Sequence, residues 1–230
     1  MRKITIAIDG FSSTGKSTVA RQLAGALAYA YVDTGAMYRA ITLYALRSGF
    51  ISGDTVDQDR LNANLKHLHI EFRHNPETGR SDMYLNGKNV EKEIRTLEVS
   101  RAVSQVSVIP EVREKLVALQ RKMGENKGIV MDGRDIGTVV FPDAELKIFM
   151  TASPDIRASR RYKELLDRGE EVAYEEVLEN VRKRDHIDAN RSVSPLKQAQ
   201  GAVVIDNSDM GLEEQFERLH NLAQQVIREE

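Results

Sequence analysis

The stretch Ile4-Thr5-Ile6-Ala7-Ile8-Asp9-Gly10-Phe11-Ser12-Ser13-Thr14-Gly15-Lys16-Ser17 decides the fold. Its first five residues are apolar or β-branched and predict a buried strand. Residues 10–17, which we call the phosphate loop, match the pattern G-x-x-x-x-G-K-S/T at every fixed position. A helical pattern follows over residues 16–28. A strand before the motif and a helix after it disfavour a chance loop of glycine and serine.

The chemistry of the phosphate loop is anion binding. Its glycines let backbone N–H groups turn inward around a phosphate, and the helix N-terminus adds a favourable dipole. Lys16 is expected to bridge the β- and γ-phosphates of ATP, and the Ser17 hydroxyl to bind Mg²⁺. The residues expected to bind ATP are Gly10, Phe11, Ser12, Ser13, Thr14, Gly15, Lys16, Ser17 and Thr18.

Short apolar runs alternate with helical patterns along the rest of the chain. Further strands are expected at residues 31–32, 128–131, 146–150 and 202–205. Helices are expected at residues 36–47, 97–108, 111–123, 153–166, 174–190 and 212–228. This alternation predicts an α/β fold in which helices flank a central parallel sheet of five strands.

Polar residues follow several of the expected strands. Asp9-Gly10, Asp33-Thr34, Asp132 and Thr151 each lie where a strand ends. In parallel sheets, ligands bind at the carboxyl ends of the strands. These residues are therefore expected to converge on one edge of the sheet.

The pattern changes over residues 62–92. Leu68, Ile70 and Phe72 alternate with polar residues, which is the period of a half-exposed strand. Residues 75–79 have turn chemistry, and Asn86-Gly87 is typical of a hairpin. A small antiparallel β insert is expected here.

Composition narrows the class of protein. The 230 residues carry a net charge of −2, whereas a protein that neutralises many nucleic-acid phosphates is normally basic. There are no cysteines, so disulfides, thiolate metal sites and cysteine nucleophiles are excluded. The apolar run at residues 4–8 is too short for a signal peptide, and no run approaches 18 apolar residues. We expect a cytoplasmic protein with neither a nucleic-acid nor a membrane partner.

Arginines that could hold a second anion follow the phosphate loop along the chain. Arginine grips a phosphate bidentately, which lysine does not. Arg184, Asp188 and Arg191 follow i, i+4, i+7 spacing and share one helix face, although spacing alone favours an ordinary salt-bridged face. The candidates for an acceptor phosphate or base are Arg39, Arg113, Arg134, Arg184 and Arg191.

Arg157, Arg160 and Arg161 also share a helix face. Solvated surface charge explains their spacing as well as a functional role does. Asp132 likewise has two readings from the residues alone: it holds a Mg²⁺-bound water, or it pairs with a nearby arginine.

Two blocks are more specific than the phosphate loop. They are Asp33-Thr34-Gly35-Ala36-Met37-Tyr38-Arg39 and Asp132-Gly133-Arg134-Asp135-Ile136-Gly137-Thr138-Val139-Val140-Phe141-Pro142. With further matches near residues 93–113, 157–161 and 184–191, the chain resembles the bacterial cytidylate kinase family over nearly its whole length. These are P-loop kinases that phosphorylate CMP and dCMP. Phe11 departs from the proline common in that family, and Ala28 from a common glycine; Phe11 can alter what packs over the loop.

The resemblance implies that the protein converts ATP and (d)CMP into ADP and (d)CDP, as a step of pyrimidine nucleotide metabolism. It also implies that the protein is a monomer. It implies a core at about 1–60, 93–152 and 196–230, a CMP-side β insert at about 62–92 and a helical lid at about 153–192, in a single P-loop kinase unit. Lys16, Arg157 and Arg161 are the implied catalytic residues, and Ser17, with Asp132 acting through water, the implied Mg²⁺ site. The implied CMP-binding residues are Thr34, Arg39, Ser104, Arg113, Arg134, Asp135, Arg184, Asp188 and Arg191.

Base choice and catalysis follow from simple chemistry. The resemblance places Ser104, Arg113 and Asp135 around cytosine. An ionised Asp135 only accepts hydrogen bonds, so it suits the exocyclic amine of cytosine and opposes the carbonyl of uracil. A monophosphate has a second pKa of about 6, so its oxygen is already a nucleophile at neutral pH and needs no catalytic base.

Two other functions remain open from the residues. One is a different small P-loop kinase that acts on UMP, shikimate or another acceptor. The other is a nucleotide switch that hydrolyses ATP or GTP slowly. The guanine-reading pattern N-K-x-D is absent, and a switch has no use for arginines on an acceptor side.

Overall fold

The computed structural model describes residues 2–229. Contacts divide the chain into two compact units. Met1–Thr34 and Leu119–Glu230 form one, which we call the sheet unit, and Gly35–Ala118 form the other, the middle unit. Within the described residues, no helix is both long and apolar enough to cross a membrane.

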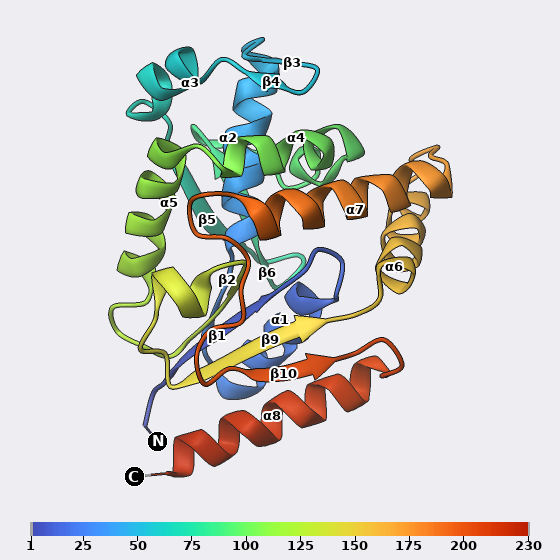
Figure 1. Cartoon of the computed structure of the whole chain (residues 1–230). Helices are drawn as coiled ribbons and strands as arrows, with labels where there is room; N and C mark the ends of the chain where they lie inside the picture. Colours follow the sequence, from blue (N-terminus) through green and yellow to red (C-terminus); the bar gives the residue numbers. More distant parts are fainter. Residues whose placement is uncertain (1, 230) are drawn as a thin grey trace. The chain divides into compact units, whose positions relative to one another are not determined.

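The sheet unit contains the predicted five-stranded parallel sheet (Figure 1). Its strands run in the order β10-β9-β1-β8-β2, so β1 is central and every one of its residues is buried. That position explains its unbroken apolar run, because a central parallel strand is covered on both faces. The strands are β1 (Thr5–Gly10), β2 (Ala30–Asp33), β8 (Ile129–Gly133), β9 (Leu146–Thr151) and β10 (Val203–Asp206).

Helices α1 (Lys16–Leu27) and α8 (Leu212–Arg228) pack together against the sheet. Val19, Leu23, Leu219 and Ala223 join the inward side chains of the strands in one buried core. Helices α6 (Pro154–Asp167) and α7 (Tyr174–Asn190) pack against each other. The hydroxyl of Ser153 caps α6 by accepting a hydrogen bond from the N–H of Ile156 at 3.4 Å.

The middle unit contains the predicted small antiparallel sheet, formed by β5 (Ile70–Asn75), β6 (Arg80–Leu85) and β7 (Lys88–Asn89). Pairs Ile70–Leu85 and Phe72–Met83 face each other across β5 and β6, as the alternating pattern requires. The remaining elements are α2 (Thr34–Arg47), β3 (Ile51–Ser52), β4 (Thr55–Val56), α3 (Gln58–Leu65), the 3₁₀ turn η1 (Glu93–Arg95), α4 (Leu97–Ser107) and α5 (Pro110–Met123), of which α2 begins in the sheet unit and α5 ends there.

Helix α3 and the β3–β4 hairpin were not predicted from the pattern. Helix α3 has eight residues and only two buried ones, Leu61 and Leu65, so its period is too short to recognise. Its start depends on Asp57, whose carboxylate accepts from the N–H of Arg60 at 3.1 Å.

Asp9, at the end of β1, fixes the chain that follows β8. Its carboxylate accepts hydrogen bonds from the N–H groups of Ile136, at 2.7 Å, and Gly137, at 2.8 Å. These open the π-helical turn η2 (Ile136–Val140). A Cβ on Gly137 would lie 3.2 Å from Cβ of Ala199 and 3.3 Å from Oδ2 of Asp9, so the space at this residue is tight. Asp9 thereby fixes the position of the backbone directly after Arg134 and Asp135.

Gly10 is where β1 turns into the phosphate loop. Its φ of 148° is one that side chains rarely adopt, and a Cβ there would lie 2.0 Å from the carbonyl oxygen of Met150 on β9. The neighbouring strand therefore excludes every other residue at this position.

We expect Gly10→Ala to lower the free energy of unfolding by about 3 kcal/mol or more, because both the backbone conformation and the space oppose a side chain. Urea denaturation followed by circular dichroism measures the change. Gly25→Ala is the matched control, since nothing lies within 4 Å of its added Cβ and alanine favours the helix by roughly 0.5–1 kcal/mol. Equal effects of the two substitutions would contradict the steric explanation.

The titration of Asp9 generates a second expectation. Burial raises the pKa of Asp9 from 3.8 to about 6, and the two backbone hydrogen bonds only partly offset this. A folded-state pKa above the unfolded one means that the contribution of Asp9 to stability is complete below pH 3.8 and is lost as the pH rises through 6. That loss amounts to about 3 kcal/mol for a shift of this size.

The variant Asp9→Asn keeps the shape of the side chain and removes its titration. Between pH 4 and pH 7, we expect the stability difference between the two proteins to shift in favour of the variant, by up to about 3 kcal/mol. Urea unfolding curves at intervals of half a pH unit measure it. A constant difference across this range would mean that the pKa of Asp9 is not raised.

Candidate active site

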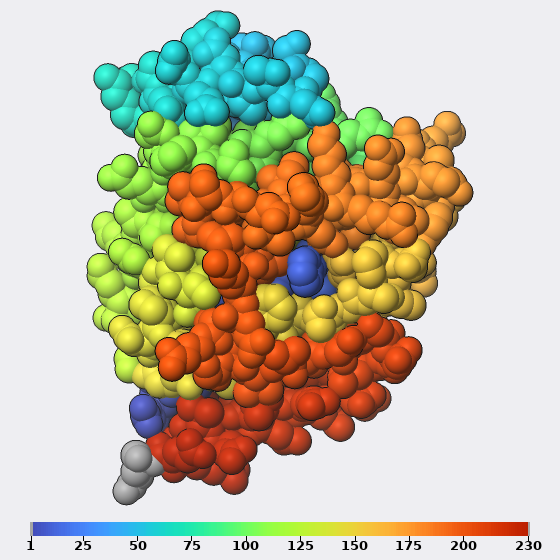
Figure 2. All heavy atoms as spheres, viewed as in Figure 1, coloured from blue at the N-terminus to red at the C-terminus, as the bar shows by residue number. Residues whose placement is uncertain are grey.

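The strand register brings the polar strand ends together in the sheet unit. Asp33 at the end of β2 is paired with Asp132 on β8, and Asp9 with Gly133. Thr151 pairs with Asp206 at the end of β10. The predicted convergence on one sheet edge is therefore present. Figure 2 shows, in blue, N-terminal atoms at the bottom of a hollow between yellow and orange segments of the same unit.

Lys16 lies inside the phosphate loop. Its Nζ donates to the carbonyl oxygen of Phe11 at 2.6 Å and to Oγ1 of Thr14 at 3.3 Å, and only 5% of the residue is exposed. Burial, and then the nearby charge of Arg134, lower the pKa of Lys16 to about 7, against the opposing effect of Asp132. A buried ammonium whose hydrogen-bond partners are a carbonyl and a hydroxyl oxygen is a group that an anionic ligand would stabilise.

The two residues predicted at the metal site touch each other. Oγ of Ser17 donates to Oδ2 of Asp132 at 3.0 Å, and the hydroxyl of Tyr31 donates to Oδ1 of the same carboxylate at 2.7 Å. Burial and the neighbouring Asp33 raise the pKa of Asp132. An oxygen-only set with one carboxylate fits Mg²⁺, which keeps several waters and shares its coordination with substrate phosphates. Tyr31 was missed because it reads as an ordinary strand residue.

A buried ion-pair cluster joins the two residues between β8 and η2 to the C-terminal end of α7. Nε of Arg134 donates to Oδ2 of Asp188 at 2.8 Å, and a terminal nitrogen of Arg191 lies 3.8 Å from Oδ1 of Asp135. Burial opposes ionisation of Asp188, but Arg134, Arg184 and Arg191 together outweigh it and lower its pKa. Asp188 and Arg191 are 4% and 8% exposed, so this part of the chain is not a solvated salt-bridged face.

Four predicted CMP-binding residues lie outside this ion-pair cluster, one in the sheet unit and three in the middle unit. The hydroxyl of Thr34 donates to the carbonyl of Asp132 at 2.8 Å in the sheet unit. Arg39 on α2, Ser104 on α4 and Arg113 on α5 belong to the middle unit. Ser104 and Arg113 are buried, and the Arg113 guanidinium lies over the Tyr38 ring, 5.7 Å from its centre.

Arg157 is buried rather than solvated. It makes two hydrogen bonds to the carboxylate of Asp185 on α7, at 2.9 and 2.6 Å, and Nε donates to the carbonyl of Ala152 at 2.9 Å. Its guanidinium lies over the ring of Phe11, 5.1 Å from the centre, and that ring meets Phe149 edge-on. Phe11 thus ties the phosphate loop to α6, in a contact that proline could not make.

The other two arginines of this face have different partners. Arg161 donates to Glu164 on its own helix at 2.9 Å. Arg160 donates to the backbone and side chain of Asn207, and to the carbonyl of Thr14 at 3.3 Å. Of the three arginines, Arg161 is the one paired with a carboxylate on its own helix, which is the pattern expected for surface charge.

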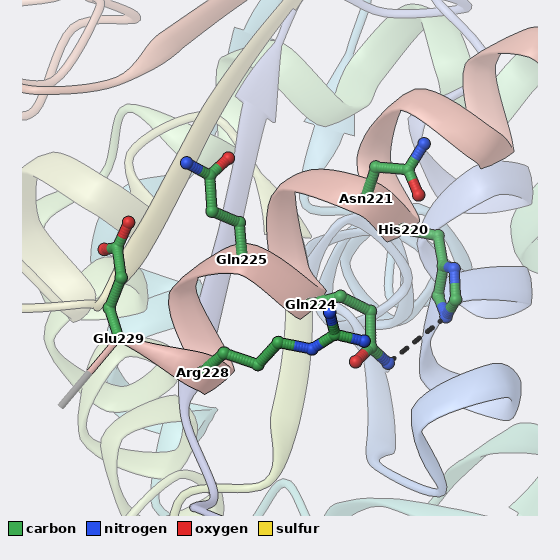
Figure 3. Close-up of a pocket in the computed structure, with 6 residues that line it drawn as sticks. All are labelled: His220, Asn221, Gln224, Gln225, Arg228 and Glu229. Atoms are coloured by element: carbon green, nitrogen blue, oxygen red, sulfur yellow. Dashed lines mark hydrogen bonds between the residues drawn. The ribbon is translucent and has the colours of Figure 1, made fainter.

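A separate surface groove lies along α8 (Figure 3). It is lined by polar side chains of that helix and by Glu229 just after it, and the ring of His220 lies 3.4 Å from the amide nitrogen of Gln224. None of the residues predicted to bind ATP, CMP or Mg²⁺ lines it. The strand ends and the phosphate loop are therefore the stronger candidate site.

Comparison with known proteins agrees with this geometry. A family model described as cytidylate kinase matches residues 6–225. The cytidylate kinase of Bacteroides fragilis (strain ATCC 25285) is 59% identical over 228 residues, which span 99% of this chain and all of that protein. The cytidylate kinase of Flavobacterium psychrophilum is 59% identical over 226 residues, spanning 98% of this chain and all of that protein.

Among solved structures, an uncharacterised protein from Eubacterium ventriosum has a similar fold. The TM-score is 0.50 at 12% identity, over 97% of this chain and 99% of that one. At this identity the likeness concerns the fold alone. The sequence relatives go further, because they match end to end and include the phosphate loop, and so this chain belongs to the cytidylate kinase family.

Proposed function

We propose that this protein is a nucleoside monophosphate kinase that transfers the γ-phosphoryl group of ATP to CMP or dCMP. One observation carries most weight. Ser17 of the phosphate loop donates to Asp132 at 3.0 Å, and Arg134, expected on the acceptor phosphate, follows two residues later and donates to Asp188 at 2.8 Å. A donor and an acceptor phosphate held by these groups would be neighbours, which phosphoryl transfer requires.

The roles follow from what each group can do. Lys16 neutralises charge on the β- and γ-phosphates, while the backbone N–H groups of the phosphate loop hold them. Arg134, Arg184 and Arg191 hold the acceptor phosphate, and Asp188 accepts hydrogen bonds from the sugar hydroxyls. No base is required, because the acceptor oxygen is largely deprotonated at pH 7.

Mg²⁺, when bound, would neutralise charge on the transferring group. Ser17 would hold it directly and Asp132 through water, a division that fits their contact at 3.0 Å. The hydroxyl of Tyr31 fixes the orientation of Asp132 for this task. Arg157 and Arg161 are the proposed arginines on the donor side, Arg157 acting from the buried position that Asp185 gives it.

Other parts of the proposal rest on the family and on composition. They are the division into core, β insert and lid, a monomeric state, a place in pyrimidine nucleotide metabolism, a cytoplasmic location and the absence of nucleic-acid partners. The net charge of −2 supports the last of these.

ADP release coupled to NADH oxidation, with ATP, Mg²⁺ and a panel of monophosphates and shikimate, tests the function. We expect CMP and dCMP to be converted at least about tenfold more efficiently than UMP, because Asp135 accepts from an amine that uracil lacks. Lys16→Ala is the control for a contaminating kinase, since it should abolish the signal. Release of ADP without any acceptor would indicate a hydrolytic switch, and a preference for shikimate another kinase.

The proposed role of Asp135 gives a sharper expectation. Asp135→Ala should reduce the ratio of CMP to UMP efficiency by about tenfold or more. Asp135→Asn should reduce it further, because its amide can donate to the carbonyl of uracil. Asp143→Ala, an exposed site shortly after η2, is the control. The base-reading role fails if the ratio stays unchanged in both Asp135 variants while kcat/KM falls.

A further inference from the structure

Asn207, directly after β10, is fully buried and uses every polar group that it has. Its side-chain Nδ2 donates to the carbonyl of Thr14 at 2.6 Å and to Oε1 of Gln215 at 2.7 Å. Oδ1 accepts from Arg160 at 3.1 Å, and the backbone carbonyl accepts from the same guanidinium at 2.8 Å. The backbone N–H donates to the carbonyl of Thr151 at 2.9 Å.

These contacts fix the direction of one peptide in the phosphate loop. In a trans peptide the C=O of one residue and the N–H of the next point in opposite directions, and no described peptide is cis. Asn207 and Arg160 hold the carbonyl of Thr14 away from the loop interior. The N–H of Gly15 must therefore point into the loop, where a phosphate would accept it.

A second carbonyl is held in the same way. Arg157 donates to the carbonyl of Ser12 at 3.3 Å, which turns the N–H of Ser13 inward by the same geometry. The carbonyl of Phe11 is different, because it accepts from Lys16 and the hydroxyl of Thr14 and so faces the interior. The contact of Thr14 with Asn207 is the shortest of those made from outside the loop.

We propose that Asn207 is a positioning residue for the triphosphate: it holds the peptide between Thr14 and Gly15 in the phosphate-binding orientation before ATP arrives, with Arg160 as its partner. Asn207 itself touches no phosphate. The inference rests on the proposed ATP site, but not on the identity of the acceptor. It assigns Arg160 a structural task distinct from the catalytic one proposed for Arg161.

Asparagine suits this task because it donates and accepts at once. Aspartate at the same position would keep an acceptor for Arg160 but would turn an oxygen toward the carbonyl of Thr14, which also only accepts. The peptide would then be repelled from its orientation, and ATP binding would have to restore it. Aspartate is thus nearly isosteric with asparagine, but it repels the carbonyl of Thr14 where asparagine attracts it.

The test compares Mg-ATP with Mg-tripolyphosphate in isothermal titration calorimetry of the purified full chain. We expect Asn207→Asp to weaken both ligands by the same factor, at least about tenfold, because both use the Gly15 N–H. Arg160→Met, which leaves the Asn207 amide in place, should weaken both by a smaller factor. The KM for CMP should change less than twofold in either variant.

Ser208→Ala is the matched control on the same loop, since the hydrogen bonds of Ser208 within the described residues go to Asp206 and Ser153 and not to the phosphate loop. Loss of ATP binding with tripolyphosphate unaffected would mean that residue 207 serves the nucleobase and would overturn the inference. So would equal losses in Ser208→Ala. If Asn207→Asp does not fold, Arg160→Met decides by the same criterion. Native protein that binds Mg-ATP but makes no CDP refutes the proposed function and leaves this inference standing.

Discussion

Backbone N–H groups of the phosphate loop must face a ligand that carries several negative charges, and a short loop rich in serine and glycine cannot keep that arrangement by itself. The sheet supplies the first constraint, because Gly10 lies against the carbonyl of Met150 and fixes where the loop begins. The helix α1 supplies the second by starting at Lys16. Arg157 and Asn207, which follow the loop by more than a hundred residues, supply the rest by holding two carbonyls outward.

The same strand also positions the acceptor side. Asp9 and Gly10 are adjacent, yet Asp9 faces η2 whereas Gly10 opens the phosphate loop. Any movement of β1 would therefore displace the loop and the residues just before η2 together. Since Arg134 and Asp135 stand at that point, the distance between the two halves of the site in the sheet unit is set by one rigid central strand.

The sequence predicted the parts of this protein that repeat a simple pattern. All five parallel strands and the helix that Ser153 caps follow from apolar period and from capping residues, which act locally. The antiparallel sheet followed from alternation and from Asn86-Gly87. Helix α3 failed the same test because two buried leucines do not define a period.

The supporting groups of the site could not be predicted, because each one works through a partner far away in the sequence. Tyr31 meets Asp132 and Asn207 meets Thr14 across more than a hundred residues. Before the fold is known, a tyrosine in a strand and an asparagine in a turn have adequate local explanations. The motif residues were found because their type is dictated by the phosphate, whereas the type of a supporting residue is dictated only by the geometry around it.

The distribution of charge explains why an arrangement with so many buried cations is stable enough to fold. Arg157 is balanced by Asp185 and Asp188 by Arg134, whereas two backbone N–H groups only partly offset the burial of Asp9. Lys16 differs from these arginines, since carbonyl and hydroxyl oxygens are its hydrogen-bond partners and burial lowers its pKa. An incoming triphosphate would replace those weak acceptors with full negative charge. The free energy that the protein gives up by burying Lys16 is thus recovered on binding, at the atom where charge must be neutralised during transfer.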